Sequence, residues 1–232
     1  MPASNKRNRT DFRHDETRSA LLEAAEAMFA ESGINGVSLR QIGLSVGSAN
    51  ANVIGYYFGD KEALIEAILL RHRLPMEEVR QKRWERAKAN GQDTDLLVLL
   101  DVLWRPLFEN TNSDGLHTYA AFLGCMSRSK YHAVRLAMSD RLPATAGLVR
   151  RISQLVPHLP EKIFWGRLNV LGELIISVLQ RMDINREDAS TSELLYRDAL
   201  SMGQAVLQAE MRHCGDNRLS SPVHPTSGIV YL

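Results

Sequence analysis

The sequence predicts an all-α protein in which a small N-terminal domain of three helices is joined by a long helix to a larger helical domain. Apolar residues recur at three- and four-residue spacing along most of the 232 residues, as they do in amphipathic helices, and we find no convincing strand. Near the N-terminus, three short helical patterns are separated by tight turns that contain glycine. This spacing is typical of a helix-turn-helix unit.

The composition limits the function classes only loosely. Lys and Arg number 28 against 27 Asp and Glu, so the formal net charge of +1 neither indicates nor excludes a nucleic-acid partner. Two cysteines are too few for a disulfide framework. Because the N-terminus is polar and no apolar run approaches the roughly 18–20 residues of a membrane span, we expect a cytoplasmic protein without a membrane partner.

The first two helices have recognisable ends. Residues 1–15 are polar and basic without periodicity, and we interpret them as a flexible basic arm. The first helix then starts at residue 16 and stops at Gly33, which suits a left-handed C-cap. Ser38 caps a second, short helix, and Gln41 completes a capping box with it.

The third and fourth helices follow from the next breaks in the pattern. Gly47 interrupts the second helix, and Asn50 is a suitable N-cap for a third short helix. Asp60 caps a long fourth helix, in which Pro75 should produce either a kink or an end. We therefore assign a helix-turn-helix domain to residues 16–60, a helical ligand-binding and dimerisation domain to 61–213, and a loose tail to 214–232.

Three blocks of the N-terminal domain resemble the DNA-binding domain of the TetR family of transcriptional regulators. The blocks are Ala24–Phe29 with Gly33, Ser38–Ile42 and Tyr57–Leu64, and their order and spacing fit the family. Residues 99–107 and 119–123 are similar to a C-terminal domain of some members. The chain departs from the family where Gly55 replaces the usual tyrosine. The resemblance implies a ligand-responsive homodimer that binds a palindromic operator in double-stranded DNA.

The residues predicted to contact DNA surround the second and third helices. Short polar side chains at the N-terminal end of a helix can reach base edges in the major groove, and asparagine can pair with adenine. The resemblance adds an arginine as a base contact and a serine and a lysine as phosphate contacts, while tyrosine hydroxyls suit phosphate oxygens. The set is Ser38, Arg40, Asn50, Ala51, Asn52, Tyr56, Tyr57 and Lys61.

Two of these residues could have roles that involve no DNA contact, and a third should be partly buried. Asn50 could serve only as an N-cap, and Arg40 could be an ordinary solvated arginine. We expect Tyr57 to be more buried than Tyr56, because one tyrosine of the pair can pack on the first helix.

A ligand pocket is expected among the middle helices, where large, mostly apolar side chains gather. The candidates are Trp104, Arg105, Leu107, Phe108, Tyr119, Phe122, Met126 and Met138. Such residues are more often plain core than ligand contacts, and Pro106 is a reason to expect a bend that opens a cavity. Arg105 could pair with an acidic ligand group, with a protein acid or with water. An apolar pocket would favour a small apolar or aromatic effector.

The two last long helices carry more apolar residues than one core-facing stripe needs, which favours a dimer interface made of four helices. Part of this apolar surface must also serve the core of one subunit. The predicted interface residues are Phe164, Leu168, Leu171, Ile175, Leu179, Leu195 and Val206.

The sequence therefore predicts a ligand-responsive, sequence-specific DNA-binding regulator, most simply a repressor released from its operator by an effector. We find no nucleophile paired with a base, no glycine-rich phosphate loop and no cluster of Cys or His at metal spacing, so we expect neither an enzyme nor a metal site nor a cofactor. The alternative is a helical protein–protein adaptor without sequence-specific DNA binding.

Overall fold

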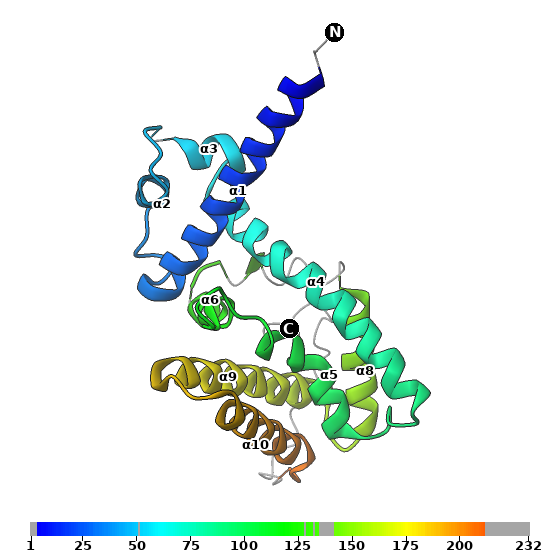
Figure 1. Ribbon diagram of the computed structural model, residues 1–232. Helices are drawn as coiled ribbons and strands as arrows, with labels where there is room; N and C mark the ends of the chain where they lie inside the picture. Colours follow the sequence, from blue (N-terminus) through cyan, green and yellow to red (C-terminus); the bar gives the residue numbers. More distant parts are fainter. Residues whose placement is uncertain (1–3, 51, 128, 132, 135–141, 212–232) are drawn as a thin grey trace.

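The computed structural model describes residues 4–50, 52–127, 129–131, 133–134 and 142–211, with residues 4–13 described by their backbone alone. Within these residues every regular element is a helix, which confirms the all-α prediction (Figure 1). The helices are α1 (Ser4–Ser32), α2 (Leu39–Ser45), α3 (Val53–Phe58), α4 (Lys61–Ala89), α5 (Leu96–Phe108), α6 (Thr118–Ser127), α8 (Pro143–Leu155), α9 (Glu161–Asn185) and α10 (Ala189–Gln208).

Helices α1, α2 and α3 form a small unit, which we call the head. Figure 1 shows α2 and α3 on the side of α1 away from α9 and α10. The head is held together by fully buried apolar side chains from all three helices and from the start of α4. These include Leu21, Phe29, Ile42, Ile54 and Leu64.

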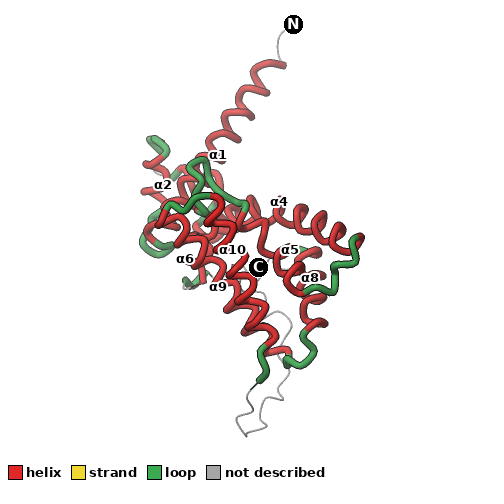
Figure 2. Tube along the Cα trace, turned by 60° about the horizontal axis from the view of Figure 1, so that its bottom comes forward, coloured by secondary structure: helices red, strands yellow, loops and turns green. Residues whose placement is uncertain are grey.

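The first helix is longer than the sequence pattern predicts. α1 begins at Ser4, so residues 4–15 continue the helix instead of forming a separate flexible arm. Neither glycine nor proline occurs between residues 3 and 32, and nothing in this stretch therefore stops a helix from extending beyond its apolar part. Figures 1 and 2 show this N-terminal part of α1 projecting away from the rest of the molecule.

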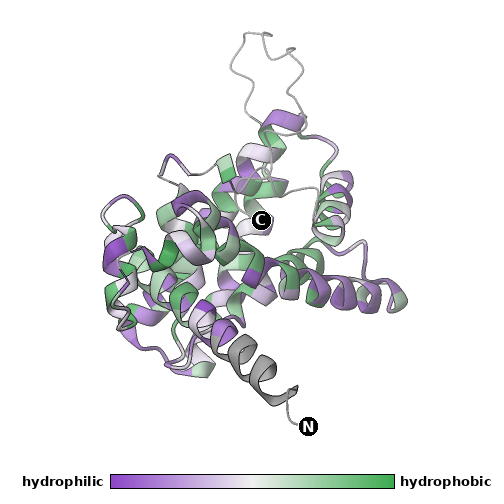
Figure 3. Ribbon diagram, turned by 90° about the horizontal axis from the view of Figure 1, so that it is seen from above, coloured by the Kyte–Doolittle hydropathy of each residue, from purple (hydrophilic) through white to green (hydrophobic). Residues whose placement is uncertain are grey.

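The long helix α4 connects the head to the remaining helices, α5–α10, which we call the body. Asp60 caps its first turn by accepting a hydrogen bond from the Ala63 amide at 2.8 Å, as predicted. Pro75 lies inside the helix, which continues to Ala89, so the prediction that the helix could end there is wrong. Seen from above, the far end of α4 carries hydrophilic residues along its outer edge (Figure 3).

In the body, α9 and α10 pack side by side, α5 and α8 pack against α4, and α6 packs against both α1 and α9 (Figure 1). Helix α6 thus connects the head to the body by a second route. By length and composition alone, α9 is apolar enough to cross a membrane, but it packs against α6 and α10 as a core helix does.

A buried carboxylate joins α4 to α8. Glu77 accepts hydrogen bonds from the amides of Ala144 and Thr145, the latter at 3.1 Å, so it caps the N-terminus of α8 from another helix. Beside it, the buried Arg80 donates through Nε to the Leu103 carbonyl at 2.9 Å. Burial lowers the pKa of Arg80 to about 10, and the charge of Glu77 opposes that shift.

Candidate nucleic-acid interface

Helix α2 starts at the predicted capping box. Ser38 Oγ accepts a hydrogen bond from the Gln41 amide at 3.3 Å, and Gln41 Oε1 accepts one from the Ser38 amide at 2.8 Å. The serine hydroxyl also donates to Gln41 Oε1 at 2.7 Å. Ser38 is exposed at the first turn, but its hydroxyl is engaged in the cap itself.

The turn between α2 and α3 brings the two helices into close contact. Gly47 adopts a positive φ of 72°, which a residue with a side chain rarely does, and so reverses the chain. Where the helices cross, a Cβ atom at Gly43 would lie 2.8 Å from Val53 Cγ1. The glycine therefore fixes how closely α3 lies on α2.

Helix α3 begins two residues later than the sequence predicts. Its N-cap position is Asn52 and its first residue is Val53. Asn50 Oδ1 accepts a hydrogen bond from the Asn52 amide at 2.9 Å, so Asn50 orders the turn that leads into α3 but is not the N-cap. Ala51 lies outside the described residues.

The side chain of Asn52 folds over the helix that it precedes. It makes no capping hydrogen bond, and its amide group occupies the position next to Gly55. A Cβ atom at Gly55 would lie only 2.4 Å from Asn52 Oδ1. The glycine at this position, where the family usually has tyrosine, thus makes room for an exposed asparagine amide.

Three of the exposed predicted DNA contacts, Arg40, Asn52 and Tyr56, have side chains that make no hydrogen bond with a described residue. Arg40 is exposed on the first turn of α2 and makes no hydrogen bond or ion pair with a described residue. Asn52 and Tyr56 are four residues apart, which places them on the same side of α3, and 71% of Tyr56 is exposed. Together they offer a guanidinium, an amide and a phenol, all of which bind DNA bases or phosphates.

The second tyrosine of α3 faces α1. Tyr57 is half-buried, as predicted, and its ring centroid lies 4.6 Å from that of His14. The rings of Tyr56 and Tyr57 meet edge to face at 5.0 Å. His14 therefore extends the aromatic cluster onto α1, a role that sequence reasoning missed because no local pattern connects residues 43 positions apart.

Lys61, which the sequence predicts as a phosphate contact, is half-buried, and its amino group is engaged within the head. Its Nζ donates to the backbone carbonyls of Ile34 and Val37 in the loop between α1 and α2, and it lies 5.4 Å from the ring centroid of Phe29. Burial lowers the pKa of Lys61, and the charge of Lys130 adds to this effect. The lysine thus donates to two backbone carbonyls of the loop between α1 and α2.

The residues predicted to line an effector pocket form closely packed core instead. Trp104, Leu107, Tyr119, Phe122 and Met126 are buried, and Phe108 stacks on Tyr196 with ring centroids 4.4 Å apart. Tyr119, from this predicted set, also lines a cavity between α1 and α4. Met138 lies outside the described residues. These side chains contribute to the core of one subunit, and their role as ligand contacts stays a prediction.

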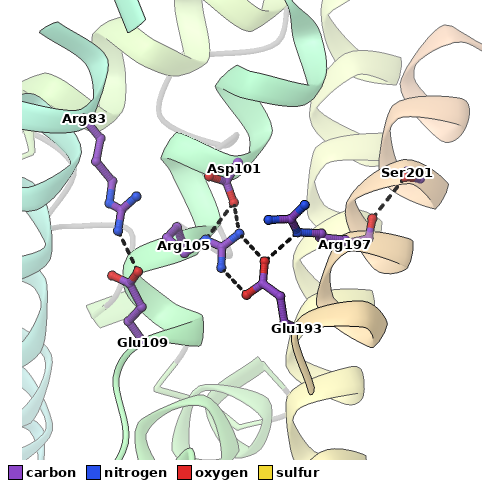
Figure 4. Close-up of polar contacts among 7 residues, drawn as sticks. All are labelled: Arg83, Asp101, Arg105, Glu109, Glu193, Arg197 and Ser201. Atoms are coloured by element: carbon purple, nitrogen blue, oxygen red, sulfur yellow. Dashed lines mark hydrogen bonds and ion pairs between the residues drawn. The ribbon is translucent and has the colours of Figure 1, made fainter. Parts of the chain in front are cut away.

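Arg105 is committed to protein acids rather than to a ligand (Figure 4). It donates to Asp101 within α5 at 2.8 Å and to both carboxylate oxygens of Glu193 on α10, at 2.6 and 3.1 Å. Burial lowers the pKa of Arg105, but these hydrogen bonds outweigh that effect and raise it above its usual range. The hydrogen bonds from Arg105 and Arg197 lower the pKa of Glu193 to about 2.

Most of the predicted dimer residues are used inside one subunit. The five on α9 are buried, since α9 packs against α6 and α10; they are Phe164, Leu168, Leu171, Ile175 and Leu179. Other apolar side chains of α9 and α10 are exposed. On α9, Val170 is 58% and Ile184 is 79% exposed, and on α10, Leu194 is 68% exposed. Leu195 is also exposed, while Val206 is half-buried.

The head has the architecture of a helix-turn-helix protein, with a short second helix, a glycine turn and a third helix whose N-cap residue, Asn52, is exposed. A family model described as "Bacterial regulatory proteins, tetR family" matches residues 21–68. The HTH-type transcriptional repressor BepR of Brucella suis biovar 1 (strain 1330) is 38% identical over 71 residues, which are 31% of this chain and 34% of the relative. Residues 21–68 are thus similar to the TetR family, and the match to BepR spans about a third of that relative's length.

Proposed function

We propose that the protein is a ligand-responsive regulator, and most simply a repressor, that binds a palindromic operator in double-stranded DNA as a homodimer in the cytoplasm. The observation that carries the proposal is the exposed set Arg40, Asn52 and Tyr56 on α2 and α3 of a TetR-type head. The relative BepR is itself named a repressor. A single short helix buries little surface, so two heads are needed for useful affinity.

A selection of bound fragments from random duplex DNA, followed by a salt titration, tests this proposal. We expect a two-fold symmetric site whose affinity falls linearly with salt on logarithmic axes. Arg40→Ala and Asn52→Ala should each weaken binding by about 1–3 kcal/mol if they read bases. Arg86→Ala is the matched control, since it removes the same charge from an exposed position at the far end of α4.

The selection also distinguishes the alternative function. If the folded dimer enriches no site, or if Arg86→Ala weakens binding as much as Arg40→Ala, sequence-specific recognition by α2 and α3 is refuted. A helical protein–protein adaptor would then be the better interpretation.

The dimer is best supported by the outer faces of α9 and α10. Val170, Ile184, Leu194 and Met202 are large apolar residues that the single chain leaves exposed on these helices. We expect Leu194→Glu to convert a dimer into a monomer in sedimentation experiments. Val79→Glu is a suitable control because Val79 is an exposed apolar residue on α4. Equal dissociation by both variants would contradict this interface.

An apolar or aromatic effector fits the cavity between α8 and α9. This cavity has a volume of about 440 Å³ and is lined by apolar side chains that include Val149, Leu159 and Trp165, with Arg150 and Glu161 among its polar residues. Trp165 would report an apolar compound directly through its fluorescence. A compound that releases operator DNA without changing the fluorescence of Trp165, measured with the other two tryptophans replaced, would place the effector elsewhere.

A further inference from the structure

A second, more polar cavity lies where the head meets the body. It has a volume of about 400 Å³ and is formed by α1, α4, the loop between α5 and α6, and the start of α6. Its lining is largely hydrogen-bonding side chains and consists of Glu23, Glu26, Ala27, Arg71, His72, Asn110, Thr111, Asn112, Ser113, Thr118 and Tyr119. Neither the predicted apolar pocket nor the cavity between α8 and α9 has this character.

The wall contributed by α1 and α4 carries two acid–base pairs. Arg71 Nη2 donates to Glu23 Oε1 at 2.6 Å, and His72 Nε2 lies 2.6 Å from Glu26 Oε2. The hydrogen bond from Arg71 lowers the pKa of Glu23. Each carboxylate already engages a basic side chain, so this wall offers donors and acceptors without a large surplus of either charge.

The wall contributed by the loop offers neutral groups that the fold does not use. Asn112 Oδ1 accepts from the amides of Asp114 and Leu116, both at 2.9 Å, which leaves the Asn112 amino group as a donor. Among the described residues, no hydrogen bond is made by the side chains of Thr111 and Ser113. The loop therefore presents an amide donor and two hydroxyls to the cavity.

Two further features complete the cavity. His72 and Tyr119 stack with ring centroids 4.0 Å apart at 16°, which gives the lining a flat, rigid aromatic element. Arg71 Nη1 is buried and has no hydrogen-bond partner among the described residues. A buried guanidinium donor without a partner is costly and is available to an acceptor on a ligand.

We propose that this cavity binds a small, neutral, polyhydroxylated compound of the size and chemistry of a monosaccharide. A hydroxyl group donates one hydrogen bond and accepts two, so adjacent hydroxyls can engage carboxylates, an arginine fork and amide donors at once. The partly exposed His72 ring, which stacks on the buried ring of Tyr119, provides a surface for the apolar face of a carbon ring. A charged ligand is disfavoured, because it would compete with the two existing acid–base pairs.

Such a ligand would touch the head through α1 and the body through the loop, and would so hold the two together. Binding itself does not depend on the proposed DNA-binding function. An effect on operator affinity would rest on that function, and it is therefore measured separately.

Binding is tested by saturation-transfer NMR and calorimetry on the full chain, with D-ribose, D-glucose and myo-inositol as neutral probes and with putrescine and acetate as charged probes. Ala27→Phe places a ring in the cavity from an exposed position on α1, while Ala20→Phe makes the same change at an exposed position of α1 outside the lining. We expect at least one neutral probe to bind, and Ala27→Phe to weaken it at least about tenfold while Ala20→Phe has little effect.

Three results would overturn the proposal. The first is that no neutral probe binds at about 10 mM, a concentration at which a Kd of that order is still measurable. The second is that only putrescine or acetate binds, and the third is that Ala27→Phe leaves the binding of the neutral probe unchanged. Retained binding of a neutral probe together with absence of any operator site would refute the DNA-binding function and leave this cavity proposal standing.

Discussion

Adding one methyl group at Gly55 tests how α3 presents Asn52. A Cβ atom at residue 55 would lie 2.4 Å from Asn52 Oδ1 and 2.9 Å from Asn52 Cγ, both well inside van der Waals contact. These atoms form the end of an exposed side chain, whereas the glycine has ordinary helical backbone angles. We therefore expect the Gly55→Ala variant to keep the backbone of α3 and to rotate the Asn52 amide away.

The two consequences of this change have opposite signs. Alanine is favoured over glycine inside a helix by about 1 kcal/mol, so the free energy of unfolding should rise by up to that amount. If Asn52 reads a base from its present position, its displacement should weaken operator binding by about 1–3 kcal/mol, which is roughly 5- to 150-fold. The variant would then be more stable and less able to bind its operator.

Urea unfolding and fluorescence anisotropy on the selected operator fragment measure the two effects. A double-mutant cycle with Asn52→Ala isolates the contact, because the Gly55→Ala effect on affinity should disappear when the amide is already absent. An equal loss of affinity in the Asn52→Ala background would show that Gly55 acts by another route. A fall in the free energy of unfolding would show that the backbone, not the side chain, yields to the methyl group.

Three further predictions concern stability. Glu77→Ala should lower the free energy of unfolding by about 3–5 kcal/mol, because it removes the cap of α8 and leaves Arg80 buried without its counter-charge; urea unfolding measures this, with exposed Glu78→Ala as the control. Glu193 has a pKa lowered to about 2 from 4.5, so its stabilisation should be complete above pH 4.5 and lost as the pH falls through 2. Its partial exposure limits the effect to about 1 kcal/mol, and Glu193→Gln should remove this pH dependence in acid unfolding curves. Lys61→Met should cost about 1–3 kcal/mol, because the carbonyls of the loop between α1 and α2 lose their donor; an unchanged melting curve would contradict this.

The features that sequence reasoning predicted correctly are local in the chain. The capping box joins residues three apart, and the cap of α4 does the same. The positive φ of Gly33 and of Gly47 follows from glycine's lack of a side chain at a helix end. Such contacts depend on neighbouring residues only, so a single sequence contains what is needed to predict them.

The contacts in the candidate sites that the sequence left undecided join distant residues. Lys61 Nζ bonds carbonyls 24 and 27 residues earlier, and Arg105 meets Glu193 88 residues later. An apolar stripe on α9 is equally consistent with a subunit core and with a dimer interface, and burial by α6 and α10 decides for the core. The spacing of apolar residues along a single sequence is the same in both cases, so it cannot distinguish a subunit core from a dimer interface.

The bonds from Lys61 Nζ also determine where the molecule can bend. Gly59, with a φ of 90°, stands between α3 and α4 and would be the natural pivot. However, the first residue of α4 is fastened across that glycine to the loop between α1 and α2, so rotation at Gly59 would break both bonds to the carbonyls of Ile34 and Val37. We therefore expect the first turn of α4 to move together with the three helices before it, so that a change in the orientation of the head relative to the body would originate further along α4.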